Sequence, residues 1–190
     1  VLRQITLFSL CVLVSGCGLS RNLYESPNTR RVLTEGSQAI LAVPELVLVE
    51  TPCPEGERND AFRRLFDYIQ GKNEADYKID MTVPVLMRGN RMAFVLPRAL
   101  TQPPSPKDEQ VTIRRVPARW VAVHRFSGSS SWSRALRQQE GLANWAEKHG
   151  YESPASPTLA VYDPPWTLPI FRRNELQIRV VRSSTQLAEK

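Results

Sequence analysis

The chain has 190 residues and a mass of 21.5 kDa, and 42% of its residues are hydrophobic, which suffices for the core of one ordinary domain. With 23% charged residues and a mean hydropathy of −0.32, the composition excludes a disordered chain, a fibre and a bundle of membrane helices. The 25 basic and 19 acidic residues give a net charge of +6, which favours anionic partners: nucleic acid, acidic lipid or a carboxylated small molecule.

The first residues have the pattern of a secretory signal. Arg3 precedes an apolar run of about ten residues, which is too short to span a bilayer. The run ends in Val-Ser-Gly-Cys at 14–17, which resembles the lipobox of bacterial lipoproteins, where the cysteine thiol accepts diacylglycerol before cleavage. We therefore expect a signal peptide over 1–16, a covalent lipid on Cys17 and a polar tether over 17–28. An ordinary signal peptide with an incidental cysteine is the alternative.

The expected lipid on Cys17 would hold the protein on a membrane of the cell envelope, facing the periplasm. Gly18 stands where an aspartate would favour the inner membrane, so the outer membrane is favoured. Export also argues against a nucleic-acid partner. After cleavage only Cys17 and Cys53 remain, so we expect no internal disulfide and interpret Cys53 as a half-buried loop thiol.

Two segments have helical periodicity. Over 59–70, apolar residues at i, i+3, i+4 and i+7 form one stripe, and Gly71 ends the pattern. The second segment runs over 130–149 and ends at Gly150, with serines at its start that can act as N-caps.

The other regular segments alternate with period two or are rich in β-formers. They predict eight strands, over 31–34, 39–50, 77–87, 92–96, 111–116, 120–126, 158–162 and 176–181. Gly89-Asn90 is a hairpin turn between the third and fourth of these strands. The predicted order is strand pair, helix, strand pair, and then the same again.

The two halves also match in residues. Thr-Val-Pro-Val-Leu at 82–86 and Thr-Leu-Pro-Ile-Phe at 167–171 are each followed by an arginine, an asparagine and an alternating strand. The match predicts a duplicated unit whose halves pack about a pseudo-twofold axis. The crevice between such halves is the natural place for a ligand.

Four segments together resemble the SOUL/heme-binding-protein family over about 33–181. They are Ala-Phe-Arg-Arg-Leu-Phe-Asp-Tyr-Ile at 61–69, Ile-Asp-Met-Thr-Val-Pro-Val at 79–85, Arg-Phe-Ser-Gly at 125–128, and Tyr-Asp-Pro-Pro-Trp-Thr-Leu-Pro at 162–169 with Arg-Arg-Asn-Glu at 172–175. The resemblance implies a distorted eight-stranded β-barrel flanked by two helices. With the internal repeat, we expect an α+β domain over 29–183, built from two ββαββ-like repeats, and a C-terminal tail over 184–190.

The resemblance also implies binding of heme or another tetrapyrrole, along the first helix and the late loop. Carried over to this chain, the ligand-binding residues are Phe62, Arg64, Leu65, Tyr68, Pro165, Trp166, Arg172 and Arg173. A porphyrin needs a flat apolar contact and cations for its propionates, which Trp166 with Arg64 or Arg172 would supply. The same side chains have structural interpretations, as core residues, a solvated helix face or a turn.

No motif selects an iron ligand or a catalytic group. His124 and His149 are the only histidines; both are weak candidates for a metal and are expected to be structural. Because the chain has no G-x-S-x-G, no H-E-x-x-H and no phosphate loop, we expect a binding protein and not an enzyme. Two alternatives remain open: an envelope scaffold, or a module for another apolar or cationic small molecule. The cation would be met by Glu45, Glu50, Asp80 or Glu175.

Overall fold

The computed structural model describes residues 24–153 and 155–183. Within this part of the chain, ten strands form one sheet in the order β1-β2-β7-β10-β9-β4-β5-β3-β6, with β8 paired to β10. The strands are β1 (Arg30–Glu35), β2 (Gln38–Val43), β3 (Leu46–Pro52), β4 (Val85–Arg88), β5 (Arg91–Val95), β6 (Thr112–Val116), β7 (Arg119–Phe126), β8 (Tyr151–Glu152), β9 (Thr158–Val161) and β10 (Asn174–Arg182). All pairings between these strands are antiparallel.

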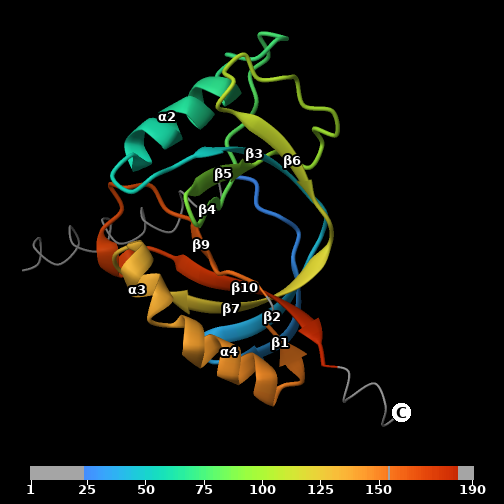
Figure 1. Ribbon diagram of the computed structural model, residues 1–190, viewed down its shortest axis with the longest axis vertical. Helices are drawn as coiled ribbons and strands as arrows, with labels where there is room; N and C mark the ends of the chain where they lie inside the picture. Colours follow the sequence, from blue (N-terminus) through green and yellow to red (C-terminus); the bar gives the residue numbers. More distant parts are fainter. Residues whose placement is uncertain (1–23, 154, 184–190) are drawn as a thin grey trace, which may run out of the picture.

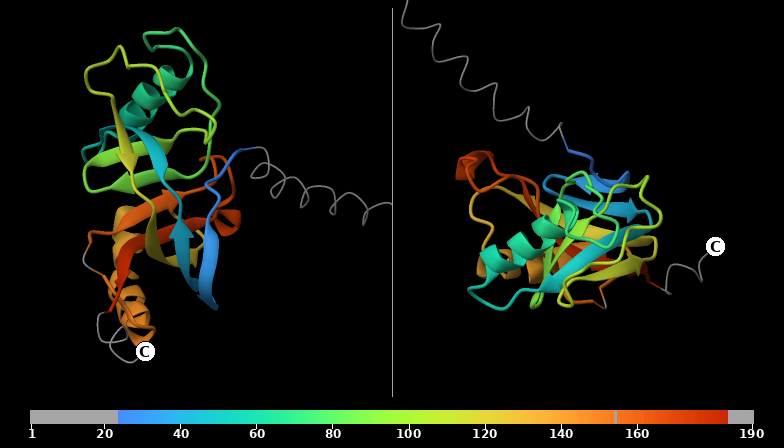
Figure 2. Two further views of the ribbon diagram at one scale, coloured as in Figure 1. Left: turned by 90° about the vertical axis from the view of Figure 1, so that its right-hand side faces the viewer. Right: turned by 90° about the horizontal axis from the view of Figure 1, so that it is seen from above.

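The helices lie on the outer face of the curved sheet (Figure 1). They are α2 (Arg58–Ile69), α3 (Trp132–Leu136), α4 (Gln139–Lys148) and the 3-10 turn η2 (Pro169–Phe171). Helix α2 packs on β3 and β5, whereas α4 packs on β7, β8 and β10. Figure 2 shows the same division from two further sides, with α2 at one end of the molecule and α4 at the other.

Three apolar clusters form the core. One lies between α2 and the sheet, and a second lies between the sheet and α3 with α4. The third contains strand residues alone and lies on the inner, concave face; we call it the inner cluster. Its buried members are Ala39, Leu41, Val43, Leu46, Leu48, Leu86, Ala93, Val95, Val121, Val123 and Ala160. The protein's own side chains therefore fill the middle of the concave face.

The predicted helix over 59–70 is confirmed as α2. The second predicted helix, over 130–149, is wrong as a single element, because it breaks between α3 and α4. At the break the N–H of Gln138 donates to the carbonyl of Ala135, three residues back. This tighter turn changes the direction of the chain.

Two of the predicted strands are also wrong in extent. The segment 39–50 is two strands, because Pro44 and Glu45 separate β2, which pairs with β7, from β3, which pairs with β5 and β6. Of the segment 77–87, only the end forms a strand, β4. Its earlier part is bound by the side chain of Asn73, which donates to the carbonyl of Tyr77 and accepts from the N–H of the same residue.

The α+β class is confirmed, but the sheet is larger than predicted and open. It has ten strands, and β1 and β6 end the hydrogen-bonded order without pairing to each other. The strand pairing therefore forms an open sheet and not the predicted closed barrel of eight strands. The internal repeat stays a prediction. Among the described residues, no helix has the length and apolar character that crossing a bilayer requires.

The predicted signal peptide, Cys17 and the tail over 184–190 lie outside the described residues. The end of the predicted tether lies inside them and is bound to the domain. The carbonyl of Glu25 accepts from the N–H of Val83 at 2.9 Å, and its side chain accepts from the N–H of Arg98 at 2.9 Å. The described end of the predicted tether is therefore bound to the domain.

Candidate ligand-binding site

The loop between β9 and β10 is held by internal hydrogen bonds. Buried Asp163 accepts the N–H of Arg173 at 2.5 Å. The guanidinium of Arg172 donates to the carbonyl of Thr167 at 2.7 Å and to the carbonyl of Pro165. Because these bonds satisfy the backbone from within, the loop keeps its shape without burying its apolar side chains.

Those apolar side chains face outward. Trp166 is 81% exposed, Ile170 71% and Leu168 59%, and Phe171 is also exposed. Four large, exposed apolar residues thus lie within six positions, and such a concentration of exposed apolar residues is typical of an interaction or ligand-binding surface.

Helix α2 adds two aromatic rings on its flank. Phe62 and Phe66, one turn apart, stack with ring centroids 6.0 Å apart, and Phe62 meets buried Phe94 edge-on at 5.1 Å. Both α2 rings remain partly exposed. We call the exposed set the apolar rim: Phe62, Phe66, Trp166, Leu168, Ile170 and Phe171.

The segment 128–130 joins the two parts of the apolar rim. Arg58, on the first turn of α2, donates to the carbonyl and to Oγ of Ser130, each at 3.2 Å. The N–H of Gly128 donates to the carbonyl of Pro169 in the late loop at 2.8 Å. Figure 1 shows the start of α2, α3 and this loop on the same side of the molecule.

Two arginines meet at this junction. Burial lowers the pKa of Arg58. Nearby Cys53 opposes this change by raising the pKa, and the positive charge of Arg172 lowers the pKa further. Among the described residues, no carboxylate forms an ion pair with Arg58 or Arg172. The junction is therefore a cationic position beside an apolar surface, which suits a ligand with both an apolar body and an anionic group.

Half of the predicted ligand-binding residues lie at this surface. Phe62 and Trp166 belong to the apolar rim, Arg172 lies at the junction, and the carbonyl of Pro165 accepts from Arg172. Arg64 lies elsewhere on α2, where its guanidinium donates to Oγ1 of Thr51 at 3.0 Å and to the carbonyl of Pro52 at 2.7 Å. These bonds tie α2 to β3, which is a structural role.

The prediction that Leu65 and Tyr68 contact a ligand does not fit their burial. Both side chains are buried between α2 and the sheet. The Tyr68 hydroxyl donates to the carbonyl of Pro104 at 2.9 Å, and burial raises the pKa of Tyr68 to about 12. Leu65 and Tyr68 belong to the buried apolar stripe of α2, which packs the helix on the sheet.

Arg173 is also directed away from the apolar rim. Its guanidinium pairs with buried Glu175 at 2.6 Å and lies 4.0 Å over the ring of Tyr162. Tyr162 packs against the inner cluster, so Arg173 belongs to the concave face. The predicted pair of neighbouring arginines is thus divided between the two faces of the sheet.

The acidic side chains suggested for a cationic ligand are largely neutralised by arginines. Glu50 pairs with Arg91 and Arg114, and Glu175 pairs with Arg173. The remaining two are Glu45, which pairs with Arg115, and Asp80, which is exposed. The described residues therefore give the cationic-ligand alternative little support.

The histidines are held by their own neighbours. Nδ1 of His124 lies 3.3 Å from Oγ of Ser37, and burial lowers the pKa of His124. Nδ1 of His149 lies 2.8 Å from the carbonyl of Trp145, and its Nε2 lies 3.7 Å from Glu35. No group of three His, Cys, Asp or Glu side chains that could hold a metal ion occurs in the described part of the chain. The apolar rim suits the ring of a tetrapyrrole, and Arg58 with Arg172 suits its carboxylates; no iron ligand is assigned.

Cys53 lies in the loop after β3, as predicted, but it is buried and not half-buried. It is buried against α2, and burial raises its pKa. A raised pKa keeps the thiol protonated at neutral pH, which is the opposite of what a nucleophilic cysteine needs.

The sequence interpretation missed Arg58 and understated the late loop. Arg58, Phe62 and Phe66 lie at i, i+4 and i+8 of α2, and this spacing could have placed all three on one flank. Nothing local to Arg58 indicates its partner Ser130, which lies 72 positions away.

Comparisons with known proteins agree with this fold. A family model described as SOUL heme-binding protein matches residues 28–179. The C-terminal domain of EcmrR is similar in structure, with a TM-score of 0.53 and 14% identity, over 76% of this chain and 97% of that chain. A hydrolase from Listeria innocua has a TM-score of 0.55 and 15% identity, over 86% and 97%. At these identities the two structures show the fold alone. No curated protein matches the chain.

Proposed function

This chain belongs to the SOUL heme-binding protein family, and on that premise we propose that it binds a tetrapyrrole without catalysing a reaction. The observation that carries the proposal is the apolar rim beside two arginines that have no carboxylate partner among the described residues. A tetrapyrrole has the matching chemistry, since it joins a flat apolar ring to carboxylate side chains.

In this proposal the ring lies against Trp166 and the neighbouring aliphatic side chains of the late loop. Aromatic stacking and burial of an otherwise exposed indole favour that contact. The propionates pair with Arg58 and Arg172. Arg172 binds loop carbonyls through Nε and Nη2. In this proposal its third nitrogen, Nη1, donates to a propionate. Affinity then rests on the ring and the propionates, and heme and its iron-free analogue bind similarly.

A lipid on Cys17 remains part of the proposal, with the domain in the cell envelope and facing the periplasm, on the outer membrane. The support is the signal-like sequence at 1–17. Because Glu25 is fixed to the domain, only seven residues separate it from Cys17, a reach of roughly 30 Å at most. The domain would then stay close to the membrane and act as a carrier or buffer for a ligand there.

The duplicated architecture also remains a proposal. The strand order supports it, because β2-β7-β10-β9 from one end of the sheet corresponds to β6-β3-β5-β4 from the other. Strands β4 and β9 pair at the centre, where the pseudo-twofold axis would pass. The apolar rim takes residues from both proposed halves.

The test is titration of the full chain, purified in mild detergent, with hemin, against a blank of detergent alone. We expect a Soret shift that saturates at one equivalent. Arg58→Gln and Arg172→Gln should each weaken binding by roughly tenfold or more, since a hydrogen bond to a charged group contributes about 1.5–3 kcal/mol.

The matched control is Arg63→Gln, because Arg63 lies on the exposed face of α2 and pairs with Asp60. It should bind hemin like the unmodified chain. A linear response without saturation, or equal affinity in all the variants, would remove the proposal. A ligand of another mass that co-purifies with the protein would favour the alternative of a different apolar small molecule.

A further inference from the structure

A second feature, on the concave face of the sheet, has no role in the proposed tetrapyrrole site. Five arginines from five different strands lie at one end of this face. They are Arg88 of β4, Arg91 of β5, Arg114 of β6, Arg119 of β7 and Arg179 of β10. We call them the concave arginines.

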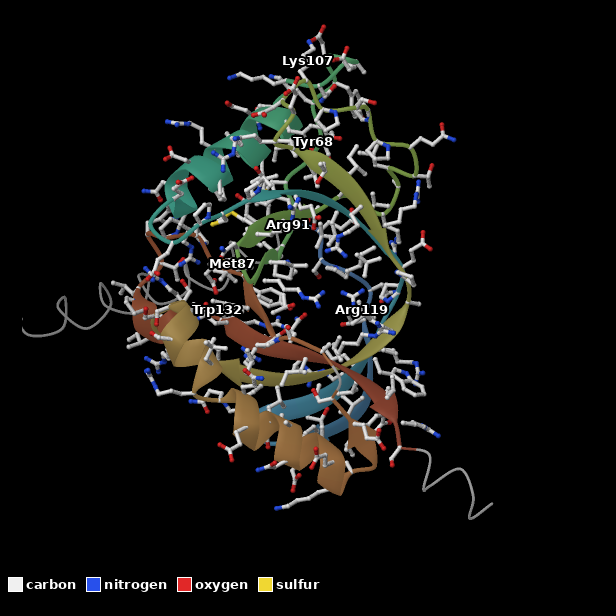
Figure 3. All side chains as sticks on the ribbon, in the orientation of Figure 1. Tyr68, Met87, Arg91, Lys107, Arg119 and Trp132 are labelled. Carbon is white, nitrogen blue, oxygen red and sulfur yellow. The ribbon has the colours of Figure 1, made fainter. Side chains whose placement is uncertain are left out.

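Strand register places these side chains on one face. Residues two apart in a strand share a face, and Val121 is part of the inner cluster, so Arg119 points to the same side. Arg179 is directly opposite Val121 in the β7–β10 pairing. Figure 3 labels Arg119 and Arg91 on the inner side of the curved sheet.

The other concave arginines follow from the same rule. Arg88 is two residues after Leu86 of the inner cluster, and Arg88 and Arg91 are paired across the β4–β5 hairpin. Arg114 is directly opposite Leu48, another member of the inner cluster.

Among the described residues, Glu50 is the one acid that forms ion pairs with them. Glu50 pairs with Arg91 at 3.2 Å and with Arg114 at 3.0 Å. Among the described residues, no acid forms an ion pair with Arg88, Arg119 or Arg179. The one hydrogen bond of the Arg119 guanidinium to described residues goes to the carbonyl of Pro117, at 3.3 Å.

The charges of this cluster act on one another. Burial lowers the pKa of half-buried Arg119, and the positive charges of Arg114, Arg179 and Arg88 lower it further. The arrangement is therefore unfavourable by itself, because like charges are held together and few counter-charges pair with them among the described residues. An anion bound by these guanidiniums relieves the repulsion and gains charge-assisted hydrogen bonds at the same time.

We propose that the concave arginines bind a small molecule with two or more phosphate or carboxylate groups. Several guanidiniums from separate strands suit an anion with more than one charged group, since each planar fork binds an oxyanion in bidentate fashion. The inner cluster closes the floor of the site with the protein's own side chains, so the ligand is compact. This site lies on the face of the sheet opposite the helices and is separate from the apolar rim.

Isothermal titration of the full chain tests this, with pyrophosphate and citrate as probes at constant ionic strength. We expect saturation at one equivalent with at least one probe, and the tighter probe shows whether phosphate or carboxylate groups are preferred. Arg119→Gln and Arg179→Gln should each weaken binding by about tenfold or more. The control Arg137→Gln, an exposed arginine between α3 and α4, should leave it unchanged.

Thermal unfolding separates loss of the site from loss of the fold. The tighter probe should raise the melting temperature of the unmodified chain, because a ligand that binds only the folded state stabilises it. Arg119→Gln should melt at the same or a higher temperature without the probe and should lose the shift. Hemin binding should be the same in Arg119→Gln, which distinguishes failure of this proposal from failure of the tetrapyrrole site.

Absence of saturable heat with both probes would overturn the proposal. Equal affinity in Arg119→Gln and the unmodified chain, or an equal loss in Arg137→Gln, would overturn it as well, because the binding would then be a general effect of net charge.

Discussion

Arg58 and Ser130 are joined by two hydrogen bonds of 3.2 Å, one to the carbonyl and one to Oγ of the serine. The first residue opens α2, and the second lies in the segment before α3. The pair therefore connects the helix on one end of the sheet with the helix region on the other. It also fixes the position of a guanidinium next to the late loop, which is where the proposed ligand requires a cation.

A double-mutant cycle should show this connection. Ser130→Ala removes one of the two hydrogen bonds and Arg58→Gln disturbs both, so each change should lower the free energy of unfolding by about 0.5–1.5 kcal/mol. The combined variant should lose less than the sum of the two, because the two changes affect one interaction. Urea unfolding of the four proteins measures the coupling free energy between the two side chains. Strict additivity of the two changes would show that the side chains act independently.

Trp166→Ala should separate ligand binding from folding. The side chain is mostly exposed, so its removal should change the free energy of unfolding by less than about 0.5 kcal/mol. Hemin affinity should nevertheless fall, since the indole provides the flat contact. Unchanged affinity would place the porphyrin ring elsewhere.

Leu65→Ala should give the opposite result. This side chain is fully buried under α2, and the resulting cavity should lower the free energy of unfolding by about 2–5 kcal/mol. Hemin affinity of the fraction that remains folded should be unchanged. Chemical unfolding and hemin titration below the unfolding transition measure the two effects.

Gly128→Ala should weaken the junction below the apolar rim. Gly128 has φ +98°, and an added Cβ would lie 2.9 Å from Nη1 of Arg134. The backbone conformation alone disfavours a side chain by about 1 kcal/mol or more, and Arg134 would also have to move. Gly141→Ala is the matched control, because its Cβ meets nothing within 4 Å inside α4. That change should stabilise the protein by about 0.5–1 kcal/mol.

Stability should fall in strong base in part through Tyr68. Its pKa rises from 10.0 in the unfolded reference to about 12 in the folded protein, so the folded state holds the proton more tightly. The contribution is complete below pH 10 and is lost as the pH rises from 10 to about 12. Tyr68→Phe should show a smaller decrease over that range in pH-dependent urea unfolding, and an equal decrease would assign it to other groups.

The sequence indicates local elements well where one periodicity dominates. Helix α2 was predictable because its buried stripe has a clear period and Gly71 follows it. The segment 77–84 was not, because the alternating pattern there competes with a side chain just before it: Asn73 binds the backbone of Tyr68, Ala75 and Tyr77. Such local capture of the backbone replaces strand pairing.

The candidate sites show the same limit. Trp166 was found through the family motif, and its neighbours Leu168 and Ile170 through the structure, since their exposure depends on how the loop is held. The concave arginines come from five strands that are distant in sequence, and only register brings them to one face. Their isolated positions in the chain look like ordinary surface charges.

The two ends of the open sheet carry arginines of their own. Arg30 and Arg31 lie on β1, and Arg114 and Arg115 lie on β6, which Pro117 follows. An unpaired strand is a template for another molecule, and positive side chains oppose such pairing because two copies would bring like charges together. Such charges disfavour edge-to-edge pairing of two copies, so an unclosed sheet need not lead to extended β-aggregates.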